Sequence, residues 1–595
     1  MKPSTECADP APRDSHRVCT DDGGFALTWF AIMLLVLIAM AGFGVDVWNW
    51  WYTSQKVQRA ADAGALAGVT FLPANFNSPA GGPNAITTAT GVIQQNGFIA
   101  GATTTVSVAQ GAKSNQLDVS VSQTVNNNFT SLLGVRTTTI SRKATAEFNA
   151  PIQMGSPAGH LGNDPENGAT DKHWLNIGGP GVDKHTGDRY ADYTNCNNSY
   201  QCSGSTNTEY FDGTYVFTVN VPASAAGTDI DIQGYDPEYA VGNTSCDNQW
   251  LSAAQLTALQ ATYPDAATRY AGGQNDYCTG DDNTNLGTPQ STAWIVRDSS
   301  VSQFQALSNP VITSGGPAGP CAHQFKGYNP PASSPNYWSD LLTPGSATYD
   351  TDFAASFHRW DTVCHISNAV PGKYFIQVRS SVPFDAAQQN STNYLTKSET
   401  PPENTSLAGQ NRYSIRVVNH GTSTVTANVQ TFAETHLPIY TNTTGASTPN
   451  FYLARLLPGG GTTGRKLHLV FYDIGDLASG TTTTITVSPP ADMSGTAPTC
   501  SWTGNGPNGL TGMPSSTVSG CTISGITSND YPAGFNGVLI TADISVGGDY
   551  NCSTAVTTGC WFKIQMNYTG GAAVQANDTT TWDASIAGDP VRLVK

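Results

Sequence analysis

The organisation of this chain depends on one stretch near its N-terminus, "FALTWFAIMLLVLIAMAGFGVDVWNWWYTSQKVQRAADAGALAGVTFL", which runs from Phe25 to Leu72. Its first part, Phe25 to Val45, carries no charge and would span roughly 31 Å as a helix, enough to cross the hydrocarbon core of a bilayer. Four aromatic residues then follow where an interfacial belt lies in membrane proteins: Trp48, Trp50, Trp51 and Tyr52. This pattern favours a membrane span over a buried core helix. We therefore predict a transmembrane helix over residues 25–47, preceded by a cytoplasmic tail over residues 1–24.

The part of the stretch after the aromatic belt is rich in alanine and glycine. Ala61, Gly64, Ala65 and Gly68 follow i, i+3, i+4, i+7 spacing, which places them on one stripe of a helix. Small side chains allow a close approach of the next layer. We therefore expect one unbroken helix from Phe25 to about Leu72, whose outer half packs on a small sheet.

The segment that follows supplies candidates for that sheet. Residues 104–110, 116–125 and 137–148 alternate apolar and polar side chains with the period of two that half-buried strands show. Residues 84–98 and 127–135 are expected to be short helices. A long N-terminal helix on a small sheet is a pilin-like α+β plan, which we assign to residues 48–150.

Composition indicates what the remainder can be. The chain has 595 residues, a formal net charge of -17, only 12% charged residues, 60 Gly and 35 Pro. The negative charge argues against nucleic-acid binding. Few charges with many small polar residues and turn formers are typical of exported β-rich proteins.

A weak internal repeat divides this β-rich part. Residues 215–238 resemble residues 451–476, because both contain an aromatic strand, a turn and a strand ending in Tyr-Asp. Residues 372–378 have a counterpart in residues 561–566. We predict two β-sandwich, jelly-roll-like domains, over residues 151–430, with disulfide-bridged insertions, and over residues 431–595. Two unrelated β-domains are the alternative.

The cysteines indicate an oxidising compartment for the β-rich part. Cys7 and Cys19 precede the apolar stretch, and ten follow residue 190, an even number that suits disulfides: Cys196, Cys202, Cys246, Cys278, Cys321, Cys364, Cys500, Cys521, Cys552 and Cys560. Local pairs such as Cys196–Cys202, Cys500–Cys521 and Cys552–Cys560 are expected. We place the N-terminus in the cytoplasm and the bulk of the chain outside the cell membrane, an orientation that three basic residues before the span and two after it support only slightly.

Signatures of catalysis are missing from the sequence. It contains no G-x-S-x-G elbow, no H-E-x-x-H pair and no P-loop. His358 and His365 flank Cys364, but a disulfide explains that cysteine better than a nucleophile does. We predict that the protein is not an enzyme and has no catalytic residue.

The sequence predicts no metal site. Asp298, Ser300 and Ser302 satisfy D-x-S-x-S, the adhesion pattern of von Willebrand A domains, yet their surroundings are predicted to be loops and strands. Two further sets of oxygen ligands are explained better as turn residues: the half calcium loop of Asp281, Asn283 and Asn285, and the strand-end carboxylates Asp236, Asp473 and Asp476. We expect no cofactor, with calcium as the one candidate.

The N-terminal stretch also resembles a known family over about fifty residues. An apolar span is followed by "G-x-x-V-D-V" and "Q-x-A-A-D-A-x-A-L-A-G", as in TadE/TadG-like proteins of Flp/Tad pilus assembly; the matching residues are Gly42, Val45, Asp46, Val47, Gln58, Ala60, Ala61, Asp62, Ala63, Ala65, Leu66, Ala67 and Gly68. The resemblance implies a single-pass bacterial membrane protein of a tight-adherence pilus, with the cell membrane and other pilus-assembly or cell-envelope proteins as partners.

Three functions are consistent with these features. The first is a structural role in pilus assembly or surface adhesion. The second is binding of a surface glycan or the cell wall, for which the 12 Trp and 23 Tyr residues could supply stacking surfaces. The third is metal-dependent adhesion of the von Willebrand A type.

Overall fold

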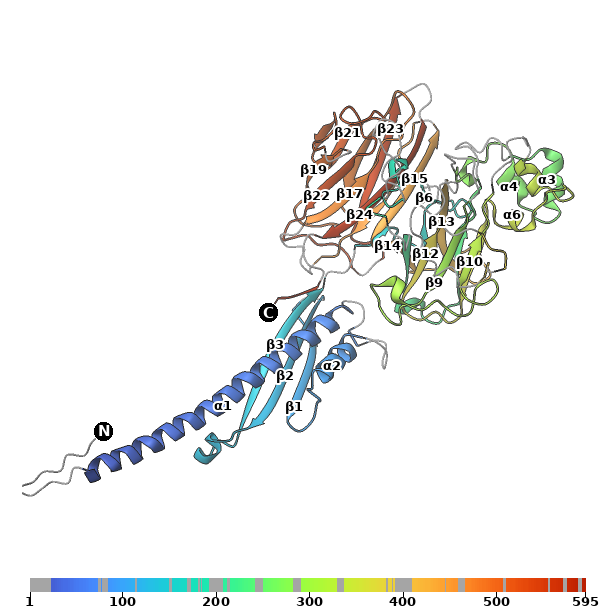
Figure 1. Cartoon of the computed structure of the whole chain (residues 1–595). Coiled ribbons are helices and arrows are strands. Elements are labelled where there is room, and N and C mark those ends of the chain that lie inside the picture. The colour runs from blue at the N-terminus through green and yellow to red at the C-terminus, as the bar shows by residue number, and fades with distance from the viewer. Residues whose placement is uncertain are drawn as a thin grey trace, which may run out of the picture. The chain divides into compact units, whose positions relative to one another are not determined.

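The structure is a computed structural model, and it describes residues 23–72, 76–77, 84–112, 115–148, 152–168, 173–179, 182, 184–191, 207–210, 215–240, 250–281, 290–328, 337–380, 384–387, 389–390, 409–444, 446–458, 466–506, 510–554, 557–570, 575–586 and 591–594. The chain divides into two compact units (Figure 1). The first contains Met1–Glu147 and Val591–Lys595, and the second contains Phe148–Pro590. The predicted tail over residues 1–24 lies almost entirely outside the described residues.

The first unit is dominated by one helix, α1, which runs unbroken from Gly23 to Val69. It is the one helix in the described part of the chain that is long and apolar enough to cross a membrane. Most side chains from Leu27 to Val45 are exposed, whereas the stripe of small residues in the second half of the helix is buried. The prediction of a single helix that continues past the aromatic belt is therefore confirmed, with its end at Val69 rather than Leu72.

A small antiparallel sheet and a second helix complete this unit (Figure 1). The sheet order is β1-β2-β3-β25, from strands Thr104–Gln110, Gln116–Asn126, Thr137–Phe148 and Val591–Leu593. Helix α2, Ala85–Gln95, begins with a capping box in which Asn84 accepts from the backbone N–H of Thr87. The predicted strands therefore form, but the return of the C-terminal β25 was not foreseen.

The predicted helix over residues 127–135 is wrong in type and length. The segment forms η1, a four-residue 3-10 helix at Thr130–Leu133, which ends at Gly134 with φ of 91°. It lies in the connection between β2 and β3. We call residues 127–135 the membrane-proximal hairpin loop, because they contact Gly42 and Asp46 near the end of the apolar part of α1.

The second unit is built from antiparallel sheets. A six-stranded sheet has the order β10-β9-β12-β7-β14-β4. Its strands are Ala322–Phe325, Thr292–Arg297, Gly372–Arg379, Tyr215–Val221, Gln430–Ala433 and Met154–Gly155. A five-stranded sheet has the order β16-β23-β18-β21-β20, from Asn450–Arg455, Trp561–Gly570, Thr481–Ser488, Thr522–Ile526 and Thr517–Ser519.

A ten-stranded sheet runs through the whole unit, in the order β11-β8-β13-β6-β15-β24-β17-β22-β19, with β5 at the side of β13. Its strands from the earlier part of the chain are Trp360–Ile366, Ile230–Tyr235, Gln410–Asn419, His173–Gly178 and His160–Leu161. Those from the later part are His436–Thr444, Gln575–Ile586, Lys466–Tyr472, Leu539–Ser545 and Thr499–Asn505. One continuous hydrophobic core contains residues from all three sheets.

The strand order contains the same arrangement twice. Strands β6 to β13 form one set, in which β11-β8-β13-β6 belong to one sheet and β10-β9-β12-β7 to another. The set β15, β16, β17, β18, β21, β22, β23 and β24 repeats this order, as β22-β17-β24-β15 and β21-β18-β23-β16. The two sets meet where β6 pairs with β15.

Local geometry supports the same correspondence. Asp236 and Asp473, each directly after a strand that ends in Tyr, both have positive φ, of 48° and 59°. Each donates its N–H to the residue that precedes the partner strand, to Arg359 O and Val538 O at 2.9 Å. The predicted boundary between residues 430 and 431 stays a prediction, because contacts treat residues 148–590 as one unit and the long sheet contains strands from both sides.

Short helices lie outside the two sets of strands. Helices α3 to α6 are Ala253–Gln260, Ala266–Tyr270, Tyr337–Leu342 and Thr351–Ser356, and they contribute to a separate core around Tyr270, Trp338 and Phe353. The remaining turns of 3-10 helix are η2 to η5: Lys184–Thr186, Ala223–Ala225, Asn275–Tyr277 and Ala306–Ser308. The first set of strands therefore contains insertions with short helices, whereas the sequence predicted only that its insertions would be bridged by disulfides.

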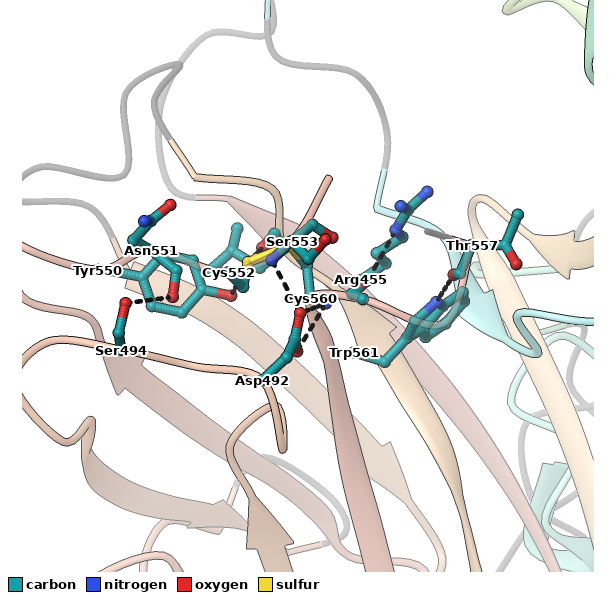
Figure 2. The surroundings of a disulfide bond; sticks show 12 residues. Arg455, Asp492, Ser494, Tyr550, Asn551, Cys552, Ser553, Thr557, Cys560 and Trp561 are labelled. Atoms are coloured by element: carbon teal, nitrogen blue, oxygen red, sulfur yellow. Dashed lines mark hydrogen bonds between the residues drawn. A yellow bond between two sulfur atoms is a disulfide. The ribbon is translucent and has the colours of Figure 1, made fainter. Parts of the chain in front are cut away.

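Three disulfides are described in full: Cys321–Cys364, Cys500–Cys521 and Cys552–Cys560. Two of them are pairs that the sequence predicted. In Figure 2, Asp492 faces the Cys552–Cys560 bridge and accepts from the backbone N–H groups of Ser553 and Cys560, at 2.8 and 3.1 Å. Cys278 is also disulfide-bonded. Cys7, Cys19, Cys196, Cys202 and Cys246 lie outside the described residues.

Candidate functional site

The candidate site lies along one face of α1, which we call the docking face. Its members recur every three or four residues, so that they share one side of the helix, and each is buried or half-buried: Gly42, Asp46, Trp50, Ser54, Val57, Ala61, Ala65 and Gly68. Most of them belong to, or lie between, the residues of the two sequence motifs. The face therefore explains why those motifs contain glycine, alanine and Asp46 at these positions.

The outer half of the docking face packs at close range against α2 and β2. A Cβ atom on Gly68 would lie 2.6 Å from the carbonyl oxygen of Ala85 and 2.7 Å from Cδ2 of Leu117. A Cβ atom on Gly64 would lie 2.6 Å from Cγ1 of Ile93. At Gly68 an added Cβ would collide with backbone, and at Gly64 it would force the side chain of Ile93 to move, so the neighbouring element approaches closely at both positions, as the small-residue stripe predicts.

Asp46 holds the membrane-proximal hairpin loop against the helix. It is fully buried, and its carboxylate accepts from the backbone N–H groups of Asn128, Phe129 and Thr130, at 2.9, 2.9 and 2.7 Å. The hydroxyl of Thr130 donates to the same carboxylate at 3.0 Å. These N–H groups belong to the start of η1, so Asp46 caps a helical turn that is more than eighty residues away in the chain.

Two further contacts fix the level at which the loop meets the helix. The ring of Phe129 occupies the space that a Cβ atom on Gly42 would need. The indole N–H of Trp50 donates to Oδ1 of Asn127 at 2.8 Å, and Asn127 in turn donates to the carbonyl of Val135 at the far end of the loop. The loop therefore lies beside the turns of α1 where the apolar run meets the aromatic belt.

The tip of the loop is apolar and exposed. Leu132 and Leu133 are 83% and 82% exposed, and Val135 and part of Phe129 are exposed as well. Leucines this exposed, side by side in a short turn, have no packing role within the chain. They form an apolar tip on the loop that contacts α1 at Gly42 and Asp46.

The aromatic belt is divided between two roles. Trp48 and Trp51 are exposed, and Trp48 stacks on Tyr52 with ring centroids 5.3 Å apart. Lys56 lies over the Tyr52 ring at 4.4 Å. Trp50, in contrast, turns toward the hairpin loop. Three of the four predicted interface residues are therefore free to meet a membrane surface, and the fourth fixes the loop.

The remaining motif residues flank this face. Gln58 donates to Asp62 at 2.7 Å along the helix, and Ala60 is buried beside Ala61. On the docking face itself, Ser54 accepts from the guanidinium Nε of Arg142 on β3 at 2.9 Å. Val45 and Val47 are exposed, as side chains that face lipid should be.

Comparison with known proteins agrees with this geometry. Residues 23–70 match the family model described as putative Flp pilus-assembly TadE/G-like. This TadE/G-like segment coincides with α1, and it contains the whole docking face. No match was found among curated proteins or among solved structures. The segment and its apolar helix support a membrane-anchored, Tad pilus-related protein.

The residues of the D-x-S-x-S pattern belong to the second unit and make local hydrogen bonds. Oδ1 of Asp298 accepts from the backbone N–H and the hydroxyl of Ser300, at 3.0 and 2.8 Å. The hydroxyl of Ser302 accepts from the backbone N–H of Gln305. The preceding strand, β9, pairs antiparallel with both of its neighbours, whereas von Willebrand A domains surround this motif with parallel strands. The geometry gives that reading no support.

Aspartates in the other turns that the sequence offered as oxygen ligands accept hydrogen bonds from backbone N–H groups. The carboxylate of Asp281 accepts from the backbone N–H groups of Ala240 and Arg412, at 2.8 and 2.7 Å. Asp473 accepts from the N–H of Gly537 at 2.6 Å, in the way that Asp236 accepts from His358. Asn283 and Asn285 lie outside the described residues.

Strand-end aspartates are strongly perturbed by burial. Burial raises the pKa of Asp236 to about 7, and it raises the pKa of Asp476 well above its usual range. Asp476 lies close to Asp578, whose Oδ1 accepts from the N–H of Asp476 at 3.3 Å. Asp236 and Asp578 are buried, whereas Asp476 is half-buried, so the shift at Asp476 reflects loss of hydration together with repulsion by the neighbouring Asp578.

The Cys/His arrangement around Cys364 is not a nucleophile with its base. Cys364 is bonded to Cys321, and it lies on β11 between two histidines with different surroundings. His358 is fully buried, and burial lowers its pKa to about 3. His365 lies at the surface beside Asp231, a neighbour that sequence reasoning did not identify.

Proposed function

We propose that this protein is a single-pass membrane anchor with a structural role in a Tad/Flp-type pilus assembly or surface-adhesion system. Its N-terminus is cytoplasmic and the bulk of the chain is extracytoplasmic. The observation that carries the proposal is the docking face: the TadE/G-like motif residues bind the membrane-proximal hairpin loop at the end of the apolar helix. A free membrane helix would not need these contacts.

The orientation is supported by the distribution of disulfides. The described bridges all follow α1 in the chain, and stable disulfides form in oxidising compartments outside the cytoplasm. A single-pass chain can place everything after α1 on one side. The acidic composition does not oppose this orientation, because Asp and Glu contribute little to the positive-inside rule.

The hairpin loop suggests how the anchor is set in the bilayer. We infer that Leu132 and Leu133 enter the lipid interface beside α1, because Phe129 of the same loop contacts Gly42, six residues or roughly 9 Å before Trp48. Apolar side chains at this level gain by leaving water. The helix and the loop would then hold the first unit to the membrane at two points, which restricts tilting and rotation.

The β-rich unit supports a structural role. The twofold set of eight strands suggests two jelly-roll-like repeats joined edge to edge through β6 and β15, and such sheets serve as rigid scaffolds. We propose other pilus-assembly or cell-envelope proteins as its partners and no catalytic activity. Glycan binding gains no support from exposed aromatics, because the exposed aromatic side chains of the described residues all belong to the first unit.

Protease treatment of cells stripped of their outer envelope tests the orientation. With a different epitope tag at each terminus, we expect external protease to destroy the C-terminal tag and to leave a small membrane-protected fragment that carries the N-terminal tag. Protection of the C-terminal tag until the membrane is permeabilised would overturn the proposal. Removal of the N-terminal tag from intact membranes would also overturn it.

A further inference from the structure

Three potential metal ligands converge at the surface of the β-rich unit. Asp231 lies on β8, His365 lies on β11, and His420 directly follows β13. These strands are neighbours in the order β11-β8-β13, and Asp231 is the direct cross-strand partner of His365. The sheet therefore brings Asp231 together with His365 and His420, which lie 134 and 189 positions later in the chain.

The ligand atoms already face one another. Nδ1 of His365 and Nδ1 of His420 each lie 2.9 Å from Oδ1 of Asp231, and the atoms that could bind a metal all lie within 4.8 Å of one another. The imidazole rings are tilted against each other with centroids 3.9 Å apart. Asp231 is 5% exposed, whereas His420 is 54% exposed, so one side of the cluster is open to solvent.

We propose that Asp231, His365 and His420 form a binding site for a divalent transition-metal ion, with Zn²⁺ as the reference ion. Two imidazole nitrogens and one carboxylate oxygen are ligands that suit Zn²⁺, Cu²⁺ or Ni²⁺ better than the all-oxygen preference of Ca²⁺ or Mg²⁺. A tetrahedral ion with bonds of about 2.1 Å separates its ligand atoms by about 3.4 Å. The two spacings of 2.9 Å between Asp231 and the histidines need to open by only about 0.5 Å to reach this value.

Groups around the cluster orient the ligands. Nε2 of His365 lies 2.9 Å from the hydroxyl of Ser367, so this hydroxyl can accept a hydrogen bond from Nε2–H while Nδ1 faces the metal. Oδ2 of Asp231 accepts from the backbone N–H of Gly421 at 3.3 Å. Outer partners of this kind fix the tautomer and the direction of metal ligands. The open side leaves room for water or for a ligand from a partner.

The alternative is that two histidines only neutralise a buried carboxylate, and the chain contains a matched example of that case. In the second set of strands, the position of Asp231 is taken by His468 and that of His365 by Asp543, because Tyr235 corresponds to Tyr472. His468 Nδ1 lies 2.6 Å from Asp543 Oδ1.

This second pair is not equipped to bind a metal. Lys466 lies 3.7 Å from the same carboxylate, and its ammonium already supplies a positive charge there. The position that corresponds to His420 is Ala587, which lies outside the described residues but offers no ligand atom. We expect His468 to pair with its carboxylate without forming a metal site.

The experiment is a Zn²⁺ titration of the full-length protein in detergent, without a histidine tag, in competition with a chromogenic chelator. The variants are His420→Gln, which keeps a hydrogen-bond donor near Asp231 but removes the imidazole, and Asp231→Asn. The control is His468→Gln. Thermal unfolding without metal confirms that each variant is folded, and His420→Gln, at an exposed position, keeps the test valid if Asp231→Asn does not fold.

We expect the wild type and His468→Gln to bind one Zn²⁺ that His420→Gln and Asp231→Asn bind at least about tenfold more weakly, since even outer-shell changes cost that much. Zn²⁺ should also raise the unfolding temperature of the wild type more than that of His420→Gln. Equal binding by the wild type and His420→Gln would overturn the site. Equal losses in His420→Gln and His468→Gln would overturn it as well. The site does not depend on the proposed anchoring function.

Discussion

The close packing of α1 against α2 makes a sharp prediction for two glycines. A Cβ atom added to Gly68 on α1 would lie 2.6 Å from the carbonyl oxygen of Ala85 and 2.8 Å from Cβ of Ala89. A Cβ atom added to Gly91 on α2 would have no neighbour within 4 Å. Both are helical, so replacement by alanine improves helix propensity by about 1 kcal/mol in each case. Only Gly68→Ala forces the two helices apart.

The magnitude follows from these two effects. Overpacking of this kind costs about 1–3 kcal/mol, and the contact at Gly68 is with backbone that cannot turn aside. We therefore expect Gly68→Ala to lower the free energy of unfolding of the first unit by about 0–2 kcal/mol, which is the overpacking cost less the gain in helix propensity. Gly91→Ala should stabilise it by up to about 1 kcal/mol. The difference between the variants, about 1–3 kcal/mol, isolates the steric cost.

Hydrogen exchange followed by mass spectrometry measures this difference in the full-length protein in detergent. Amides of α2 and β2 in Gly68→Ala should exchange about five- to 150-fold faster than those in Gly91→Ala, since 1.4 kcal/mol corresponds to a factor of ten. Equal exchange rates in the two variants would show that α1 does not dock through Gly68, and the packing argument would fail.

Three further predictions concern other contacts. Asp46→Asn replaces one acceptor oxygen by an amide that repels the backbone N–H groups it faces, so the amides of η1 should exchange faster, while those of α2 stay unchanged. Because burial lowers the pKa of His358 from 6.5 to about 3, the unfolded chain alone takes up this proton as pH falls. The contribution of His358 to the free energy of unfolding should therefore decrease by up to about 1.4 kcal/mol per pH unit from pH 6.5 to 3, and denaturant titrations should show it as the difference between the wild type and His358→Asn, since the raised carboxyl pKa values act in the opposite direction in both proteins. Replacing both Cys552 and Cys560 by serine opens a short loop and should cost about 2–3 kcal/mol in the β-rich unit, and an unchanged unfolding temperature would contradict the structural role of the bridge.

The long helix and the small sheet could be predicted because their signals are local. An uncharged apolar run and a stripe of small residues are both properties of a single segment, and α1 follows them from Gly23 to Val69. The alternation in residues 104–110 and 137–148 predicts β1 and β3 with their observed bounds. Local periodicity is the strongest signal that a sequence carries about secondary structure.

Contacts between distant segments could not be predicted in this way. Asp46 is visible in the sequence as a motif residue, but nothing local indicates that its carboxylate binds N–H groups 82 to 84 residues away. Strand β25 has only three residues, too few for their pattern to predict that the C-terminal end of the chain pairs with the first sheet. Asp231 and His420 each look like an ordinary strand-end residue until the sheet brings them together.

The repeat lies between these cases. The shared Tyr-Asp strand ends are local, and the positive φ of Asp236 and Asp473 shows that the pattern marks the same backbone turn twice. The pairing of β6 with β15, which joins the two sets into one long sheet, depends on strand edges that no pattern in the sequence identifies.

The central claim is that α1 and the membrane-proximal hairpin loop meet the membrane together, and site-specific photo-crosslinking tests it most directly. A photoreactive benzoyl-phenylalanine is incorporated at Leu133, at the loop tip, and separately at Ala112, an exposed residue in the β1–β2 turn at the opposite end of β2. Leu117, beside that turn, meets α1 at Gly68, 26 residues or about 39 Å along the helix from Gly42. After irradiation of native membranes, we expect lipid adducts at position 133 and none at position 112. A protein adduct at position 133 without lipid, or lipid adducts at both positions, would contradict the account.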